Sequence, residues 1–593
     1  MRLQYIQDKI KQFQDYINQV EKKAYRYSLL RLGFFVFSCC LWYQGYEKQN
    51  GILYNIGAII CLGLFIWFVY LHRSCKKKII EITALQQAYQ DITLRKSDEW
   101  KTFEDTGVEF LSESNKQAYD LDIFGNASLF QYLNCTKTPF GRTYLASLLS
   151  CSKQNIDEIK QRQEAVQECS KLEAFTMQVV STSKLFSNHQ KKRKQEKLEE
   201  VLQYLETYKQ TYPTWFRIIW YILSFYTLVC LVGVLCFQMN LAYFLIGAVL
   251  SLSLSFLFVM LNMQVLSPVA YSAQIMKEYQ RFLTLIKSQE FQSDWMKYEQ
   301  AQCKDALDAI TKLERILQSI QARNNFLLHI MLNACCLIDF HCVYALEQWK
   351  LTYGKDVRRW LEAVGKIEAI VSLTQIDYAK ESTCYPNIWK QSNMHIELQE
   401  MYHPLLLEQK AISNSFTTST QTYILTGSNM SGKTTFLRSI GLNMVLFHAG
   451  AAICASHATL SSMHIYTSMR VHDNVNEGIS TFYAEILRIK EMMEASKNKE
   501  EMLVLIDEIF KGTNSADRIL CATQAIRKLH QPWIFTMVST HDFELCALEN
   551  ELDAKNYHFS EYYENDQIYF DYLLKEGRCT TTNAQALMRM AGF

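Results

Sequence analysis

The stretch TGSNMSGKTTFL, residues 426–437, has the spacing G-x-x-x-x-G-K-[ST] of a phosphate-binding loop. A short β-rich run, YILT, leads into it and an amphipathic helical pattern follows it. Gly427 and Gly432 allow the backbone to wrap tightly, so that amide groups and the helix N-terminus point at phosphate oxygens. Lys433 is expected to bridge the β- and γ-phosphates, and the Thr434 hydroxyl is expected to coordinate Mg²⁺. The stretch therefore predicts an α/β nucleotide-binding domain.

Two further apolar runs end in residues suited to phosphate chemistry. The run MLVLIDEIF, residues 502–510, is continuously apolar, as a buried parallel strand requires, and it reaches Asp507 and Glu508. We expect Asp507 to hold Mg²⁺ directly or through water, and Glu508 to act as general base for the attacking water. A third strand, WIFTMVST, leads to His541, which would face the γ-phosphate as a sensor. Together these patterns predict nucleotide hydrolysis.

Size and composition narrow the class of protein. The 593 residues predict two to four domains. The net charge of +1 argues against a strongly basic protein that coats DNA. The 18 cysteines show no repeated C-x-x-C pairing and indicate a reduced, cytosolic environment. The cluster ACCLIDFHC, residues 334–342, is interpreted as buried helix thiols and not as a metal site.

Four long apolar runs indicate membrane spans. They form two pairs with very short connections, EKQNG and QMN, and each pair predicts a helical hairpin. Twenty apolar residues are enough to cross about 30 Å of hydrocarbon, although Arg31 interrupts the first run. The alternative is that all four are buried core helices of a large soluble protein. The runs are 29–46, 52–71, 218–237 and 241–261.

Basic flanks predict the orientation of these hairpins. Lysines and arginines lie before and after the first hairpin and upstream of the second, so the positive-inside rule places both termini and the intervening segments in the cytosol. The expected location is thus a multi-pass protein of the inner, cytoplasmic membrane, with a cytosolic ATPase domain. The run KKRK, residues 191–194, could contact nucleic-acid phosphate, but a juxtamembrane position favours anionic lipid.

Several motifs together resemble the ATPase domain of the MutS family of DNA mismatch repair proteins. The loop motif is joined by NEGISTFYAEI (476–486), LIDEIFKGTNSADR (505–518) and STHDFEL (539–545), and MYHPLL resembles the start of that domain. Upstream, the segments 121–150 and 361–388 resemble the two ends of the MutS helical core. The likeness covers roughly residues 108–180 and 355–593.

The resemblance implies a dimeric ATPase that uses ATP and Mg²⁺. Ser480 falls at the signature serine, which in ABC-type ATPases reaches the nucleotide of the opposite subunit, so it would act in trans in a homodimer. From the residues alone, the preferred interpretation of Ser480 is an ordinary N-cap before a helix. The loop KGTNSAD, residues 511–517, would cross the dimer interface. The implied nucleotide-binding residues are Gly427, Ser428, Asn429, Met430, Ser431, Gly432, Lys433, Thr434, Thr435 and, in trans, Ser480.

The sequence departs from the family in its sensing parts. Only about 27 residues precede the first hairpin, which leaves no room for the mismatch-reading domain with its Phe-x-Glu wedge. The middle, where the family carries a DNA-gripping clamp, contains the second hairpin instead. We therefore expect an α/β P-loop (ABC-type) ATPase domain at the C-terminus, preceded by an all-α lever and core region with two transmembrane hairpins. The expected divisions are 1–27, an N-terminal cytosolic helix; 28–72, hairpin; 73–210, helical core; 211–264, hairpin; 265–400, helical core; and 401–593, ATPase domain.

Three functions fit this organisation. The first is a membrane-anchored MutS-like ATPase coupled to DNA, with mismatch recognition itself doubtful because no mismatch-reading residue can be named. The second is an ATP-driven transporter, which is disfavoured because, beyond Arg31 near the start of the first run, the four runs carry no Asp, Glu, Lys or Arg that would mark a pathway. The third is a membrane scaffold in which ATP binding sets the dimer state and DNA plays no part.

Overall fold

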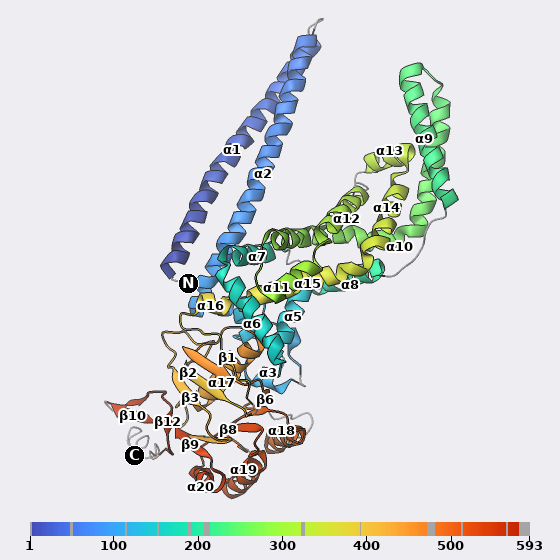
Figure 1. Ribbon diagram of the computed structural model, residues 1–593. Helices are drawn as coiled ribbons and strands as arrows, with labels where there is room; N and C mark the ends of the chain where they lie inside the picture. Colours follow the sequence, from blue (N-terminus) through green and yellow to red (C-terminus); the bar gives the residue numbers. More distant parts are fainter. Residues whose placement is uncertain are drawn as a thin grey trace.

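Figure 1 shows a sheet-containing end, a helical middle and two long helical hairpins that project to the same side, away from the sheets. The computed structural model describes most of the chain. The residues outside that description are 1–2, 48–50, 113–114, 151–152, 187–190, 207–213, 322–325, 392, 471–480, 512–513, 565–566 and 580–593.

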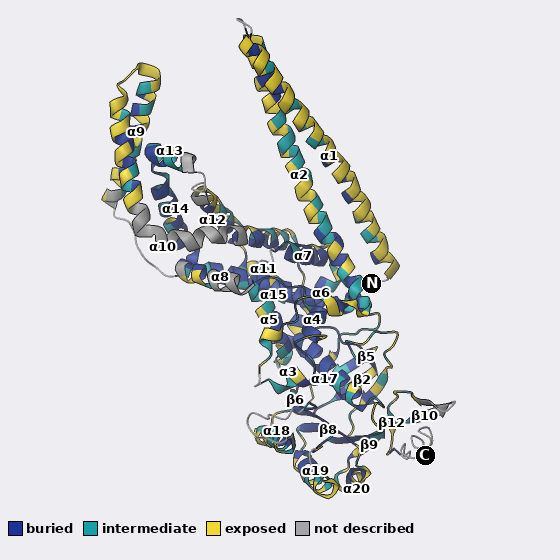
Figure 2. Cartoon of the chain, turned by 180° about the vertical axis from the view of Figure 1, so that it is seen from behind, coloured by how far each residue is buried: buried dark blue, intermediate teal, exposed yellow. Residues whose placement is uncertain are grey.

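The first hairpin consists of α1 (Leu3–Glu47) and α2 (Ile52–Lys96). Each helix has 45 residues and is about 68 Å long at 1.5 Å per residue. The distal half of the hairpin carries the apolar runs, where Phe34 stacks on Phe68 at 5.5 Å between ring centroids. The proximal half is polar and forms a stalk. Figure 2 shows that the distal half is largely exposed.

The second hairpin consists of α9 (Thr214–Phe237) and α10 (Leu241–Ser288). All four predicted runs are helical. Within the described residues, two helices are long and apolar enough to cross a membrane, Ile52–Lys96 and Arg217–Phe237. The fourth run contributes a shorter apolar stretch, Leu241–Leu257. The first run lies in the second half of α1, and Arg31 stands near the start of that run. Of the four predicted spans, two are thus helices that meet this length and composition requirement within the described residues.

The helical region between and around the hairpins packs on α15, which is buried along nearly its whole length. Gly141 and Gly365 allow α5 and α15 to cross closely, since a Cβ on Gly365 would lie 2.6 Å from the Gly141 nitrogen. The region's helices are η1 (Asp98–Thr102), η2 (Val108–Phe110), α3 (Lys116–Asp120), α4 (Leu129–Leu133), α5 (Pro139–Ser150), α6 (Ile156–Lys171), α7 (Glu173–Leu185), α8 (Lys191–Glu206), α11 (Asp294–Gln302), α12 (Ala306–Gln321), α13 (Phe326–Cys336), α14 (Ile338–Tyr353), η4 (Gly354–Asp356), α15 (Val357–Leu373) and α16 (Gln375–Ala379).

The buried Glu368 ties three of these elements together. Its carboxylate accepts hydrogen bonds from the Lys137 amide at 2.8 Å, the Thr138 hydroxyl at 2.5 Å and the Ser183 hydroxyl at 2.7 Å. Burial raises the pKa of this carboxyl, and the hydrogen bonds oppose that rise. These bonds link α15 to the start of α5 and to α7, so the helical region is pinned at one polar point inside an apolar core.

The C-terminal domain contains a six-stranded sheet of order β12-β9-β4-β8-β7-β6, in which every neighbouring pair except β12–β9 is parallel. The strands β4, β7 and β8 are buried at every residue, as the apolar runs predict. The elements are β4 (Thr422–Thr426), α17 (Lys433–Ala449), β6 (His464–Ser468), α18 (Thr481–Ser496), β7 (Met502–Asp507), α19 (Ser515–Leu529), β8 (Ile534–Thr540), η6 (Phe543–Ala547), α20 (Leu548–Leu552), β9 (Lys555–His558) and β12 (Lys575–Glu576).

A second sheet of order β1-β5-β2-β3 packs beside α17, and a two-stranded hairpin, β10–β11, projects from the domain (Figure 1). Strands β1 and β2 of this sheet lie in a stretch for which the sequence pattern predicted helix. Helix ends at Ala379. Beyond it β1 pairs with the distant β5, and β2 pairs with β5 on one side and with β3 on the other. The strands are β1 (Asn387–Ile388), β2 (Ile396–Met401), β3 (Asn414–Thr417), β5 (His457–Leu460), β10 (Glu561–Glu564) and β11 (Gln567–Phe570).

Candidate nucleotide site

The loop between β4 and α17 wraps around the ammonium group of Lys433. Its Nζ donates hydrogen bonds to the carbonyl oxygens of Gly427 at 2.7 Å and Ser428 at 2.8 Å. Gly427 and Gly432 have φ values of +147° and +111°, which favour glycine. Lys433 is 4% exposed, and burial lowers its pKa. A phosphate would give this buried cation an anionic partner in place of neutral carbonyls.

The loop interior fits a phosphate. A Cβ on Gly427 would come within 2.8 Å of both the Phe559 carbonyl and the Ser431 hydroxyl, so the loop admits no side chain there. The Ser431 hydroxyl is buried and has no hydrogen-bond partner among the described residues. An unpaired buried hydroxyl at the base of a glycine loop is available to an entering oxygen. At the loop tip, Asn429 and Met430 are exposed.

Thr434 and Asp507 meet at the carboxyl end of the parallel sheet. The Thr434 hydroxyl donates to Asp507 Oδ2 at 2.8 Å, and the Ser539 hydroxyl donates to Asp507 Oδ1 at 2.5 Å. Hydroxyl and carboxylate oxygens are ligands that Mg²⁺ prefers, usually with several waters retained. Ser539 was not predicted, because only the pairing of β7 with β8 sets it opposite Asp507.

Glu508 lies just beyond β7, with its backbone in the left-handed region at φ +51°. Its carboxylate contacts His541 Nε2 at 3.0 Å and Lys511 Nζ at 3.1 Å. The hydrogen bond from His541 is the main cause that lowers the pKa of Glu508 to about 2, and Lys511 adds to it. The carboxylate is therefore ionised at neutral pH and is held in place on both oxygens. Lys511 was not singled out from the sequence.

Ser480 lies outside the described residues, as do the rest of 471–480 and two residues of the loop 511–517. The elements that flank these segments are described. The Asn514 side chain caps α19 by accepting a hydrogen bond from the Asp517 amide at 2.9 Å. Arg518, one residue further, pairs with Asp542 at 2.6 Å.

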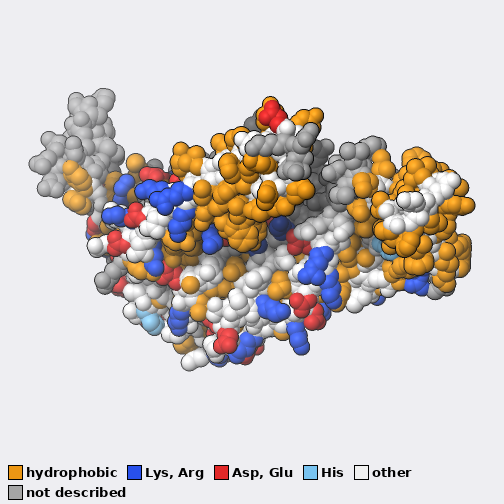
Figure 3. Space-filling model, turned by 90° about the horizontal axis from the view of Figure 1, so that it is seen from above, with side chains coloured by type: hydrophobic (Ala, Val, Ile, Leu, Met, Phe, Trp, Pro, Cys, Tyr) orange, Lys and Arg blue, Asp and Glu red, His pale blue; other side chains and the backbone are white. Residues whose placement is uncertain are grey.

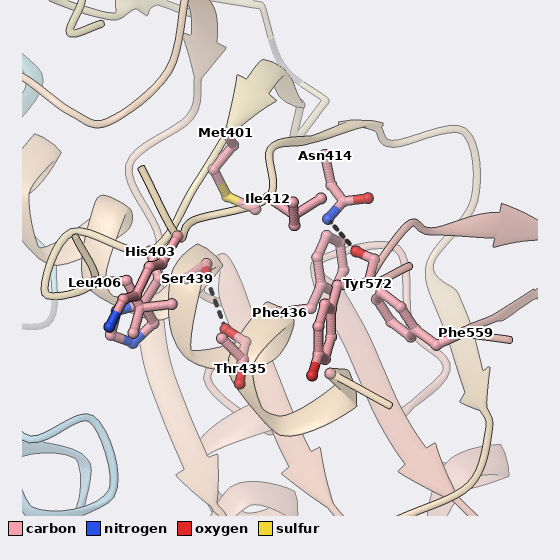
Figure 4. A pocket seen from close by; sticks show the side chains of 12 residues that line it. Met401, His403, Leu406, Ile412, Asn414, Thr435, Phe436, Ser439, Phe559 and Tyr572 are labelled. Atoms are coloured by element: carbon pink, nitrogen blue, oxygen red, sulfur yellow. Dashed lines mark hydrogen bonds between the residues drawn. The ribbon is translucent and has the colours of Figure 1, made fainter. Parts of the chain in front are cut away.

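A cavity of about 220 Å³ opens beside the loop, between α17 and the second sheet. Figure 4 shows Phe436, Phe559 and Tyr572 along one side of it and His403 on the other. Asn414 fixes the Tyr572 segment by donating to its carbonyl at 3.0 Å. Burial lowers the pKa of His403 to about 3, so this imidazole is neutral. Sequence reasoning missed this pocket, since its walls come from segments far apart in the chain.

Aromatic and apolar side chains line much of the pocket, as a site for a flat aromatic base requires. Gly432 and Thr435, at the N-terminus of α17, are among the residues that line it, so the pocket adjoins the phosphate loop. The remaining lining residues are Met401, Leu406, Lys410, Ile412 and Ser439.

The loop, the acids at the carboxyl end of the parallel sheet and the neighbouring base pocket define a P-loop ATPase domain. Residues 423–593 match the family model for MutS domain V. The C-terminal part of this chain is therefore similar to MutS domain V.

Curated relatives agree with that assignment. The chain is 29% identical over 243 residues to the DNA mismatch repair protein MutS of Persephonella marina, covering 39% of this chain and 27% of the relative. It is 31% identical over 172 residues to MutS of Natronomonas pharaonis, covering 28% and 20%, and 25% identical over 254 residues to MutS of Methanococcoides burtonii, covering 41% and 28%. The chain thus spans about a quarter of the length of these relatives.

Proposed function

We propose that this chain is a membrane-anchored, MutS-like ATPase that binds and hydrolyses Mg²⁺·ATP. The observation that carries the proposal is the arrangement of Thr434, Asp507 and Glu508 around the phosphate loop. Lys433 would neutralise the β- and γ-phosphates, and Thr434 with Asp507 would hold Mg²⁺, which supplies a Lewis acid for the phosphate oxygens. The pocket lined by Tyr572 would receive adenine.

In hydrolysis Glu508 would orient the attacking water and accept its proton. The lowered pKa keeps this carboxylate ionised at neutral pH, so that it can both orient the water and accept its proton. His541 would hold the Glu508 carboxylate in place and would face the γ-phosphate. Its hydrogen bond to Oε1 leaves the second oxygen to Lys511.

Activity would require a homodimer. This part rests on the resemblance of NEGISTFYAEI to the family signature, which gives Ser480 a role on the partner's nucleotide. The helix α18 begins at Thr481, so its N-terminal end follows Ser480 directly. The partial positive charge of a helix N-terminus favours a γ-phosphate facing it.

The hairpins would anchor the protein in a membrane. Only 11% of the most apolar window of α2 and 22% of that of α9 is buried, which speaks against the alternative of core helices. Figure 3, a view from above, shows apolar side chains gathered over both hairpins. Both hairpins project to the same side in Figure 1, so one bilayer can accommodate both tips while the sheets remain on one side of it. The basic residues that flank the runs support a cytosolic ATPase domain.

DNA is proposed as the ligand coupled to ATP turnover, because the curated relatives are named DNA mismatch repair proteins. Contacts to phosphates alone would give binding that is blind to sequence and sensitive to salt. The alternative ligands are lipid, protein or a transported substrate.

The test is ATP turnover by detergent-purified full-length protein, alone and with matched or mismatched linear duplex DNA, at two salt concentrations. The Lys433→Ala variant serves as the blank. Stimulation that fades at high salt supports coupling to DNA, and a preference for mismatched DNA would assign recognition as well. If no DNA changes the rate of ATP turnover, the protein is an ATPase but DNA is rejected as its ligand. No turnover above the blank rejects the ATPase itself.

A further inference from the structure

Residues 326–346, here called the elbow, carry a single charged side chain, Asp339, in the sequence FLLHIMLNACCLIDFHCVYAL. They form α13 and the first half of α14, which meet at an angle of 81°. Leu337 makes the break, with φ at +48°. Figures 1 and 2 both place α13 beside α9 of the second hairpin.

Protein groups of the elbow and of α9 complete the hydrogen bonds of the elbow's broken backbone. A helix end leaves carbonyl and amide groups without partners inside the helix, and water normally completes them. Here the Cys335 carbonyl accepts a hydrogen bond from the Thr227 hydroxyl of α9 at 2.8 Å. The Asn333 side chain accepts from the Asp339 amide at 3.2 Å, and the Asn333 carbonyl accepts from the Leu337 amide at 3.2 Å. Such pairing is what a helix break needs where water is scarce.

The one carboxylate of the elbow is also enclosed. Asp339 is 4% exposed, and its oxygens contact His329 Nε2 at 3.0 Å, Asn333 Nδ2 at 3.1 Å and the Ser255 hydroxyl of α10 at 3.2 Å. Ser255 lies within the apolar run of the second hairpin. The carboxylate thus joins the elbow to that hairpin and presents no charge outward. Ionisable groups at membrane depth are tolerated in this paired, inward-facing form.

Aromatic contacts run along the base of α9. Trp220 packs on Phe340 at 5.1 Å between ring centroids, and Arg217 Nη1 contacts the Tyr344 hydroxyl at 2.5 Å. From Arg217 to Thr227 the contact extends for ten residues, about 15 Å along α9. The elbow therefore reaches roughly half the thickness of a hydrocarbon layer of about 30 Å, if α9 spans it.

We propose that the elbow is a re-entrant element that enters the lipid bilayer beside α9 and α10, with Asp339 as its internal clamp and lipid acyl chains against its outer face. The outer face includes Met331, which is 65% exposed. This inference rests on the membrane anchoring proposed above. It adds a third apolar insertion that continues the surface of the second hairpin, and it gives the cluster 334–342 a role other than buried core thiols.

The experiment uses full-length protein in vesicles of phosphatidylcholine and phosphatidylglycerol that contain a phospholipid with a diazirine on its acyl chain. Illumination labels residues in contact with acyl chains, and mass spectrometry identifies the labelled peptides. We expect label in 326–336 as well as in 52–71 and 217–237. The helix α11, on the side of the ATPase domain, should remain unlabelled and serves as the internal control.

Two outcomes overturn the inference and remain distinguishable. If the hairpins are labelled and residues 326–336 are not, the insertion of the elbow is rejected and the membrane anchoring by the hairpins is kept. Unlabelled hairpins reject the elbow and the anchoring together.

Substitutions at Met331 sharpen the test, because an exposed position tolerates a polar side chain in water. Met331→Asp places a short charge that cannot extend to the surface, so label in 326–336 should be lost while label in 217–237 persists. Met331→Leu is the matched control and should keep both. ATP turnover should be unchanged in both variants, since Met331 is remote from the phosphate loop. Equal labelling of the Asp and Leu variants would contradict the inference.

Discussion

Asp120 and Arg488 form an ion pair, with 2.8 Å between Oδ2 and Nη1, although 368 residues separate them in the chain. Asp120 ends α3 of the helical region and is fully buried, whereas Arg488 belongs to α18 of the ATPase domain. The same carboxylate accepts hydrogen bonds from the Thr467 hydroxyl at 2.8 Å and the Arg470 amide at 3.1 Å. The helical region is thus fastened to Arg470, which directly precedes the segment 471–480 that carries Ser480, and to Arg488 of α18, the helix that follows it.

Asp122 extends this joint to the phosphate loop. It pairs with Arg438 of α17 at 2.8 Å and with Arg470, which lies two residues after β6. A change in the position of α17 would therefore alter its ion pair with Asp122, which adds to the hydrogen bond between Arg162 of α6 and the His448 carbonyl of α17. These contacts offer a physical route from nucleotide to hairpins.

We predict that Asp120→Asn destabilises the protein strongly. Removing one charge of a buried pair leaves the other uncompensated, at a cost of about 3–5 kcal/mol. The measurement is urea denaturation of the detergent-solubilised protein. The matched control is Lys116→Ala, which breaks a more exposed pair with Glu491 at the same joint and should cost at most about 1 kcal/mol. Equal losses in the two variants would contradict a special role for Asp120.

A second prediction concerns the base pocket. Tyr572→Ala should weaken ATP binding roughly 5- to 150-fold, because stacking of a base on an aromatic side chain contributes about 1–3 kcal/mol. Inhibition of ATP turnover by tripolyphosphate should be unchanged, since that ligand has no base. The control is Tyr569→Ala on β11, which removes a ring stacked on Tyr562 outside the pocket. If tripolyphosphate loses affinity as ATP does, Tyr572 supports the loop and not the base.

The parts of the site that depend on residues close together in the chain could be predicted from the sequence. The loop before Lys433 and the acids after β7 follow from local spacing and from the rule that strand ends carry the ligands. Ser539 could not be found this way, because its place opposite Asp507 follows from strand register. Asn414 and Tyr572 lie 158 residues apart and meet only once β3 and the segment after β11 are folded.

The same limit explains the differences in the fold. Strands β1 and β2 lie in a stretch that was expected to be helical, and their pairing with β5 is a long-range event that local sequence does not specify. Apolar composition predicted four helices of a similar kind. In the structure the four helices differ in apolar length and in charge, and two of them are long and apolar enough to cross a membrane. These differences depend on where each helix begins and ends and on what packs against it.

The hydrogen bond between Glu508 and His541 predicts a pH dependence. The pKa of Glu508 is lowered from an ordinary value of 4.5 to about 2, so the resulting stability is fully present above about pH 4.5 and is lost as the pH falls toward 2. His541→Gln removes the main cause and should lower stability at pH 7. The difference from wild type should shrink below pH 4.5.

The measurement is the thermal unfolding midpoint of both proteins at pH 7, 5, 4 and 3. Lys511→Gln removes a smaller cause and should give a smaller difference with the same pH trend. A difference that stays constant down to pH 3 would show that His541 acts by packing and not through the carboxylate.

The last prediction separates an ATPase that cycles from a scaffold that only binds. Glu508→Gln keeps the shape of the side chain but removes the proton acceptor, so turnover should fall about 10²- to 10⁴-fold while ATP affinity is retained. If hydrolysis reopens the dimer, this variant should accumulate as a dimer with ATP, whereas the wild type should return to monomer as ATP is consumed. Light scattering after size-exclusion chromatography measures both. Lys433→Ala should neither turn over ATP nor dimerise with it, because its loop lacks the cation that faces the phosphates. A wild type and Glu508→Gln variant with the same ATP-dependent dimer lifetime would favour the scaffold, since turnover would then leave the assembly unchanged.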